Sequence, residues 1–295
     1  MRIALLYEHP TWSQDLIGRA TELGLDVTAF DVGAFQFDPL NHHFDVWVNR
    51  VNAMPSAGRP PSIVASTGHV LLQLELHGQR VVNGSQTHRI GGSKLAQAAL
   101  FTSLGLANPA GIGIYDPSQA SAAAAQLGYP VLTKPNVGGS GSGIVRYDAP
   151  SELDQAVAAG AIDLGIDGTG LVQKIIDSAD GLIHRVEMLG TEFFYGTEQQ
   201  LQPDAFNYCA IDGCSTEDTA IRLFAPPVEI IDHAAATMKA AQTDVGGVEY
   251  TIDASTGEPT FYDFNPYSNF ITGHDAELGF NPIDRYLSFI QEPTQ

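Results

Sequence analysis

Short apolar runs alternate with helical apolar spacing along the first ninety residues. This alternation is typical of strands joined by helical crossovers, which form a parallel sheet. The expected elements are strands over Ile3–Leu6, Val27–Phe30, Phe44–Val48 and Arg80–Val82, a helix through Leu16 that ends at Gly24, and a helix over Ser66–His77. Ligands gather at the carboxyl ends of parallel strands. We therefore expect chemistry at the residues that follow these strands, which are Glu8, His9, Arg50 and Asn83.

Two further groups of elements follow. The second group contains a strand that carries Lys134 and three helices, which span Ser93–Leu104, Asp116–Leu127 and Ser151–Ala159. The third contains a helix over Val228–Ala241 and strands over Leu171–Ile176, Ile183–Leu189, Glu192–Tyr195, Gly247–Ile252 and Thr260–Phe264. These three groups are expected to form three domains, over residues 1–90, 91–168 and 169–295.

One loop in the second group has the composition of a phosphate-binding element. Between Val131 and Tyr147 the chain reads VLTKPNVGGSGSGIVRY, which predicts a strand, a flexible loop and a returning strand. Glycine lets backbone N–H groups approach a ligand, serine adds hydroxyl donors, and Lys134 supplies positive charge. The pattern favours a flap over a polyphosphate, with a plain flexible hairpin tip as the alternative. The flap residues would be Gly138, Gly139, Ser140, Gly141, Ser142 and Gly143.

Composition excludes several classes of function. The net charge of −20 would repel phosphate backbones and anionic lipids, so we expect neither nucleic acid nor a membrane as a partner. Two cysteines, Cys209 and Cys214, are too few for a disulfide framework or a cysteine-based zinc site. The sequence has no long apolar run and no signal-peptide pattern, which predicts a cytoplasmic protein. The Walker A, dinucleotide-binding, zincin and nucleophile-elbow motifs do not occur.

Oxygen-bearing side chains in the third group are candidates for a metal site. Asp263 and Asn265 lie two residues apart on one expected strand, so both side chains face one side of the sheet. Glu249, on the neighbouring strand, can reach the same face. Such oxygen ligands suit magnesium, which completes its shell with waters and phosphates. A polar strand edge with capped turns is the alternative interpretation.

These landmarks, taken in order, resemble the ATP-grasp superfamily. They are Lys94 at a helix start, Lys134 before a glycine-rich hairpin, the hinge Gln173-Lys174-Ile175-Ile176, Gly247-Val248-Glu249, and Asp263-Phe264-Asn265. Their order and spacing are similar to those of RimK-type carboxylate–amine ligases over nearly the whole chain. The resemblance implies a chain of α/β and α+β class. It implies an ATP-grasp fold with an N-terminal parallel-sheet pre-grasp domain, a small lid lobe and a C-terminal antiparallel-sheet lobe.

The resemblance also assigns roles to residues. It implies that Lys94 and Lys134 contact the phosphates of ATP and that the glycine-rich loop covers them. It implies that the hinge residues Gln173, Lys174, Ile175 and Ile176 hold adenine. Two magnesium ions, with Mn²⁺ as an alternative metal, would be bound by Glu249, Asp263 and Asn265.

Two positions depart from the family pattern. The family's usual acidic ribose ligand is replaced by Ile183, and Asp177 or Asp180 is left to take that role. The family's arginine that stabilises an acyl phosphate is missing from the stretch Phe206-Asn207-Tyr208-Cys209. Arg185 and Arg222 are the candidates to replace it as catalytic residues.

The resemblance implies a ligase that activates a carboxylate with ATP and joins it to an amine. Its expected partners are small-molecule or peptide carboxylates and amines, and an assembly of identical subunits is left open. The alternatives are a kinase on the same fold and a nucleotide-binding regulatory protein without turnover. Three residues are candidates to bind a substrate carboxylate: Arg50, His69 and Asn83. The alternative interpretations are, in the same order, a surface charge, a polar residue on a helix face and a turn residue.

Overall fold

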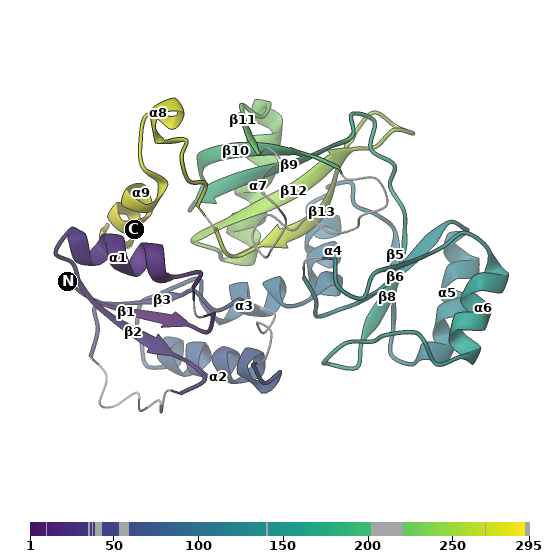
Figure 1. Cartoon of the computed structure of the whole chain (residues 1–295), viewed down its shortest axis with the longest axis horizontal. Helices are drawn as coiled ribbons and strands as arrows, with labels where there is room; N and C mark the ends of the chain where they lie inside the picture. The colour runs from purple at the N-terminus through teal and green to yellow at the C-terminus, as the bar shows by residue number, and fades with distance from the viewer. Residues whose placement is uncertain are drawn as a thin grey trace.

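The computed structural model describes residues 1–9, 11–34, 36, 38, 43–52, 59–139, 141–201, 221–268 and 270–292. These residues form three sheets, which lie in three separate parts of the molecule (Figure 1). Two helices connect the first part to the other two: α3 (Ser85–Gly91) and α4 (Lys94–Ser103). The candidate site lies where the second and third sheets face each other.

The first sheet is parallel throughout, as its sequence pattern predicts. In spatial order its strands are β2 (Asp26–Asp31), β1 (Arg2–Tyr7), β3 (Val46–Asn49) and β4 (Val81–Val82). Its neighbouring helices are α1 (Gln14–Glu22) and α2 (Ser62–Leu76). Helix α2 begins four residues before the expected Ser66, because Pro61 sits at its N-cap, where a missing N–H costs nothing.

The second sheet carries the glycine-rich loop. Its spatial order is β5 (Gly111–Ile114), β8 (Gly170–Lys174), β6 (Val131–Pro135) and β7 (Val145–Tyr147). Strands β6 and β7 pair antiparallel across the loop, which confirms the expected strand, loop and returning strand. A short 3₁₀ turn, η1 (Pro117–Gln119), precedes the two helices on the outer side of the sheet, α5 (Ala120–Leu127) and α6 (Pro150–Ala158) (Figure 1). Although the sequence placed it at the start of the third group, β8 pairs with β5 and β6.

The third sheet is antiparallel. Its spatial order is β11 (Arg222–Phe224), β10 (Glu192–Gln200), β9 (Leu182–Leu189), β12 (Val245–Ile252) and β13 (Pro259–Asn265). Helix α7 (Val228–Ala241) has the predicted bounds and covers one face, where Val186, Met188, Val248 and Phe264 pack with its apolar side. Because side chains alternate along a strand, the residues between these apolar ones point to the opposite face. That opposite face holds the polar groups of the site.

The end of the chain returns to the first sheet. Helix α9 (Pro282–Gln291) follows the short α8 (Asp275–Leu278) and lies against α1, where Asp284 Oδ1 accepts from Arg19 Nε at 2.6 Å. Tyr286, Leu287 and Ile290 share one apolar core with residues of β1 and β3. Within the described ranges, no helix is long and apolar enough to cross a membrane.

Candidate active site

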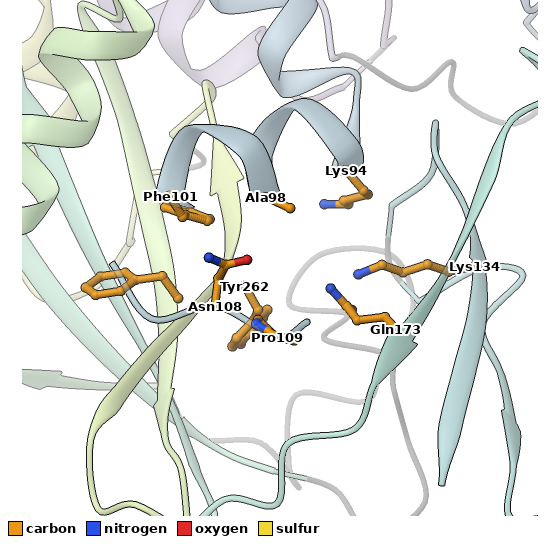
Figure 2. Close-up of a pocket in the computed structure, with 9 residues that line it drawn as sticks. Lys94, Ala98, Phe101, Asn108, Pro109, Lys134, Gln173 and Tyr262 are labelled. Carbon is orange, nitrogen blue, oxygen red and sulfur yellow. The ribbon is translucent and has the colours of Figure 1, made fainter. Parts of the chain in front are cut away.

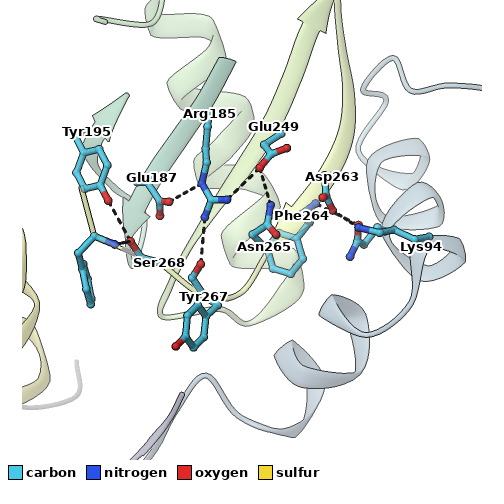
Figure 3. A network of polar contacts seen from close by, with 12 residues as sticks. Lys94, Arg185, Glu187, Tyr195, Glu249, Asp263, Phe264, Asn265, Tyr267 and Ser268 are labelled. Atoms are coloured by element: carbon cyan, nitrogen blue, oxygen red, sulfur yellow. Dashed lines mark hydrogen bonds and ion pairs between the residues drawn. The ribbon is translucent and has the colours of Figure 1, made fainter. Parts of the chain in front are cut away.

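Three strands of the third sheet place their polar side chains in two rows. The first row runs Arg185, Glu249, Asp263 across β9, β12 and β13, and the second runs Glu187, Gly247, Asn265. All six positions lie on the face opposite α7, because they alternate with the residues that contact that helix. Figure 3 shows the side chains of this face directed toward one another. The expected grouping of Glu249 with Asn265 is present, with Asn265 Nδ2 donating to Glu249 Oε1 at 3.1 Å.

Arg185 lies at the centre of the two rows. Its guanidinium donates to Glu187 Oε1 at 2.6 Å, to Glu249 Oε1 at 3.0 Å and to the carbonyl oxygen of Tyr267 at 3.1 Å. Burial lowers the pKa of Arg185, but the carboxylates of Glu187 and Glu249 raise it above its ordinary value. The planar guanidinium is thus held in one orientation by three acceptors.

A glycine in the second row makes this arrangement possible. A Cβ at Gly247 would lie 3.1 Å from Arg185 Nε and 3.1 Å from Glu187 Cδ. Both distances are shorter than ordinary van der Waals contact, so a side chain at this position would displace the two groups. Gly247 therefore leaves the space in which Arg185 and Glu187 meet.

Lys94 reaches this face from the N-terminus of α4. The helix begins there because Ser93 Oγ accepts from the Ala96 N–H at 3.1 Å, which caps its first turn. Lys94 Nζ forms an ion pair with Asp263, and the side chain of Lys94 is 15% exposed. Burial raises the pKa of Asp263, but the charge and hydrogen bond of the Lys94 ammonium, with other nearby cations, outweigh this effect. The net shift of the pKa is therefore downward. Burial, and then the charge of Asp263, raise the pKa of Glu249.

Lys134 lies opposite Lys94 on β6. Burial, and next the charge of Lys94, lower the pKa of Lys134 from 10.5 to about 7. Both ammonium groups point into one pocket of roughly 200 Å³ of empty space between the second and third sheets (Figure 2). The pocket is lined by Lys94, Ala98, Phe101, Asn108, Pro109, Lys134, Gln173, Phe261 and Tyr262. Two lysine side chains facing one small pocket favour an anionic ligand, because negative charge would stabilise the protonated form of Lys134.

Asn136 joins the two lysine-bearing elements, a role that the sequence did not indicate. Its Oδ1 accepts from Ser93 Oγ at 2.9 Å and from the Leu95 N–H at 3.0 Å. Its carbonyl oxygen accepts from the Lys94 N–H at 3.0 Å, and its Nδ2 donates to Asp167 at 2.8 Å. The end of β6 is therefore fixed to the start of α4, which sets the position of Lys134 relative to Lys94.

The expected hinge lies at the edge of the pocket. Gln173 is 6% exposed and lines the pocket, whereas Lys174 Nζ turns away to donate to the carbonyl oxygen of Gly128 at 2.9 Å. Ile175 and Ile176 follow the end of β8 and are half-buried. Asp180 forms an ion pair with His184 at 2.9 Å.

The glycine-rich loop folds back on Pro135. A Cβ at Gly143, whose φ is +72°, would lie 2.8 Å from Pro135 Cγ, so the loop requires glycine there. Gly138, Gly139, Gly141 and Ser142 lie in the same loop, with Ser142 N–H donating to the carbonyl oxygen of Gly139 at 3.0 Å. Ser140 lies outside the described residues.

Some predicted residues lie apart from this face. Arg222 pairs with Glu198 at 3.2 Å, and Glu198 aligns with His184, so Arg222 belongs to the face that α7 covers. This position argues against Arg222 as the substitute for the missing arginine. The stretch that contains Asn207 lies outside the described residues. His69 is exposed on α2.

Asn83 has a structural role in this fold. Its Nδ2 donates to the carbonyl oxygens of Val245 and Pro266, and its Oδ1 accepts from the N–H groups of Asp244 and Val245. These bonds use both amide hydrogens and the amide oxygen. The contacts therefore give no support to a role in substrate binding.

Arg50 follows β3 and reaches the segment after β13. It is 2% exposed, its Nη1 donates to the carbonyl oxygen of Ser268 at 2.8 Å, and its guanidinium stacks 3.8 Å from the centre of the Tyr267 ring. Since Arg185 bonds the backbone of the same Tyr267, Arg50 and Arg185 approach one segment from two different sheets. Arg50 thus contacts the segment that Arg185 of the polar face also bonds.

Comparison with known proteins places this geometry in a known fold. No family model matches the chain. The RimK domain ATP-grasp protein of Sphaerobacter thermophilus is 16% identical and superposes with a TM-score of 0.70 over 99% of this chain and 100% of its own. The D-alanine–D-alanine ligase of Bacillus anthracis complexed with ATP is 15% identical, with a TM-score of 0.69 over 98% and 95%. The chain therefore has the ATP-grasp fold.

A further structure and one sequence relative agree with this fold. D-cycloserine synthetase DcsG is 18% identical, with a TM-score of 0.67 over 98% of this chain and 97% of its own. A D-alanine–D-alanine ligase of Kocuria rhizophila is 43% identical over 60 residues, which are 18% of this chain and 16% of that protein. The α/β and α+β architecture predicted from the sequence is thus confirmed.

Proposed function

We propose that the protein is an ATP-dependent ligase that joins a carboxylate to an amine. The observation that supports this most directly is the convergence of Lys94 and Lys134 with Glu249, Asp263 and Asn265 between two sheets. Two cations beside a set of carboxylate and amide oxygens suit a polyphosphate with its metal ions. The structures named above include a D-alanine–D-alanine ligase complexed with ATP and a D-cycloserine synthetase, which supports the proposal.

ATP and magnesium are the proposed cofactors. Glu249, Asp263 and Asn265 supply hard oxygen donors on one face, which is the donor chemistry that magnesium prefers, with Mn²⁺ as an alternative. Among the described residues no three acidic, histidine or cysteine side chains are placed to hold a metal ion together, so the amide of Asn265 completes the proposed set. When bound, the metal ions would neutralise charge on the transferring phosphoryl group. Their proposed number is two.

The remaining nucleotide contacts are proposed from the pocket. Lys94 and Lys134 would hold the phosphates, and the loop of Gly138 to Gly143 would cover them. Gln173 to Ile176 would contact adenine, chiefly through backbone groups. Asp180, at the far end of the hinge segment, is the proposed ribose ligand.

Arg185 is the residue that we propose to stabilise the activated carboxylate. Its side chain is half-buried, its guanidinium remains charged, and it is oriented by Glu187 and the backbone of Tyr267. A fixed cation at this place offsets the negative charge that develops on the carbonyl oxygen during amine attack. Arg50, which reaches the same segment, would meet the substrate carboxylate from the first sheet.

The three parts of the chain would then have different roles. We propose residues 1–90 as the substrate-binding part, 91–168 as the lid and 169–295 as the part that holds metal and performs transfer. The substrates would be small-molecule or peptide carboxylates and amines, and the place of action would be the cytoplasm. A structure of the ATP-grasp ligase PsnB, with a TM-score of 0.67, contains a minimal precursor, which supports including peptides in the screen.

A single assay tests the proposal. The protein is incubated with Mg-ATP and pooled amino acids or peptides, and ADP release is followed with and without hydroxylamine. ADP together with a hydroxamate is the expected result, because hydroxylamine traps an activated acyl group. ADP with a stable phosphorylated product would identify a kinase instead. Nucleotide binding without ADP would identify a regulatory protein.

A further inference from the structure

Glu187 is a buried carboxylate, and the roles proposed above involve only one of its two oxygens. It is 3% exposed, and its Oε1 accepts from Arg185 Nε at 2.6 Å. Its Oε2 is buried and has no hydrogen-bond partner among the described residues. A carboxylate offers about four acceptor positions, and leaving one oxygen of a buried carboxylate unbonded costs free energy. A ligand donor at Oε2 would offset that cost.

The fold aims Glu187 at the proposed transfer site. It shares a row with Asn265 across Gly247, and the missing side chain at Gly247 leaves room for Glu187 to meet Arg185 of the first row. Figure 3 shows Glu187 on the side of Arg185 away from Glu249, Asp263 and Lys94. Glu187 therefore lies beyond the proposed metal ligands, on the side of Tyr195 and Ser268.

The hydroxyl group of Tyr195 does not bond Glu187 Oε2. Tyr195 Oη contacts Ser268 Oγ at 3.2 Å and accepts from the Ile271 N–H at 3.2 Å. Its hydrogen-bonding capacity is thus directed to the segment after β13. Arg185 donates to Glu187 Oε1, Glu249 and Tyr267 and makes no hydrogen bond to Glu187 Oε2. Because one guanidinium serves both Glu187 and Glu249, a cationic donor at Oε2 would stabilise the Glu187 carboxylate.

We infer that Glu187 Oε2 binds the amine substrate and accepts a proton from it, an inference that rests on the proposed ligase function. The ligand class is a primary or secondary amine that is protonated at neutral pH. A primary ammonium loses two protons on becoming an amide nitrogen. Glu187 takes one, the nitrogen forms the C–N bond as the C–O bond to phosphate breaks, and the leaving phosphate takes the other as HPO₄²⁻.

The test compares two nucleophiles on the same activated carboxylate. A carboxylate found in the amino-acid screen is supplied with Mg-ATP and either an amino acid amine or hydroxylamine. Hydroxylamine is largely uncharged at neutral pH and loses one proton only, which the leaving phosphate takes. It therefore reports carboxylate activation without the step assigned to Glu187.

The informative variant is Glu187→Gln. Its amide oxygen still accepts from Arg185, while its NH₂ group cannot accept at the second position. We expect the ratio of amide to hydroxamate product to fall about 100-fold, the scale of general base catalysis. Glu198→Gln, on the face that α7 covers, is the matched control and keeps the wild-type ratio.

Three results overturn the inference. An unchanged ratio with both products reduced equally means that Glu187 acts only by orienting Arg185. An unchanged ratio with full activity means that Oε2 meets no substrate. Wild-type protein that forms neither ADP nor hydroxamate refutes the ligase function itself, and the inference with it. If Glu187→Gln unfolds in a thermal melt, Glu187→Asp replaces it, with a raised KM for the amine as the expected result.

Discussion

At the scale of single residues, the site consists of charges that hold one another in place. Arg185 is shared by Glu187 and Glu249, and Lys94 is paired with Asp263. Burying any one of these charges without its partner would destabilise the folded protein. The removal of one partner therefore changes the state of the next, and single substitutions test the network directly.

Asp263→Asn removes the charge that faces Lys94. We expect turnover to fall at least ~100-fold, because the carboxylate supports charge neutralisation during transfer, while the Kd for ATP rises less. Steady-state ADP release and calorimetric ATP titration measure the two quantities. Asp253→Asn, in the β12–β13 turn, is the control with normal turnover. Equal losses of turnover and ATP affinity would argue against this role.

Lys134→Met tests the cation on β6. Because the phosphates lose one of two facing ammonium groups, the affinity for ATP should fall, whereas Lys239→Met on the exposed side of α7 should leave it unchanged. Calorimetric titration with Mg-ATP gives both values. Unchanged affinity in Lys134→Met would remove this lysine from the proposed site.

The lowered pKa of Lys134 also predicts a pH dependence of stability. Between about pH 7 and 10.5 the unfolded chain holds a proton on Lys134 that the folded chain has released. The free energy of unfolding therefore rises with pH in this window, by at most about 1.4 kcal/mol per pH unit from this group. Urea unfolding of nucleotide-free protein at neutral and alkaline pH should show this rise in the wild type and a smaller one in Lys134→Met. Parallel curves would contradict the buried state of Lys134.

At the scale of elements, strand alternation decides what the sequence can predict. Residues two positions apart on one strand share a face, so Asp263 and Asn265 were expected on one face with Glu249 beside them, which is where the structure has them. The face of Arg222 depends on the register of a three-residue edge strand, which the sequence does not reveal. Glu187 follows the same alternation two residues after Arg185, a signal that was present in the sequence. Asn136 acts between two elements, and only tertiary structure reveals such contacts.

Gly247→Ala tests the space between the rows. The added Cβ would crowd Arg185 and Glu187, so we expect a loss of stability of about 1 to 3 kcal/mol and a loss of turnover. Gly18→Ala is the control, because no atom lies within 4 Å of its added Cβ, and alanine is the better helix former on α1. Thermal melting and ADP release give both results. Full turnover in Gly247→Ala would contradict this account, because it would show that Arg185 and Glu187 can be displaced without loss of activity.

Asn136→Ala tests the connection between β6 and α4. It removes the bonds of one side chain to Ser93, Leu95 and Asp167, and each lost bond costs about 1 kcal/mol. We expect weaker ATP binding, because Lys134 and Lys94 are no longer fixed relative to each other. Asn108→Ala is the comparison variant. Asn108 also lines the pocket, but its side chain bonds only Thr102 and Leu106 and does not connect β6 with α4. Equal ATP affinity in the two variants would contradict the connecting role of Asn136.

At the scale of the whole molecule, the chain brings distant segments to one place. The pocket lies between the second and third sheets, and Arg50 extends from the first sheet toward the segment after β13. Local patterns predicted the parallel first sheet, and the family resemblance predicted the lobe with the glycine-rich loop and the antiparallel lobe, although β8 was assigned to the wrong group. Their mutual packing was not, because it depends on contacts such as those of Asn83 with Val245 and of α9 with α1.

The most direct test of the central claim follows the oxygen atoms of the carboxylate. A substrate carboxylate labelled with ¹⁸O is incubated with Mg-ATP and the amine, and the released phosphate is analysed by mass spectrometry. If the carboxylate is activated as an acyl phosphate, one labelled oxygen passes into each phosphate when the C–O bond breaks. Phosphate without label, or amide formed without phosphate release, would contradict the account.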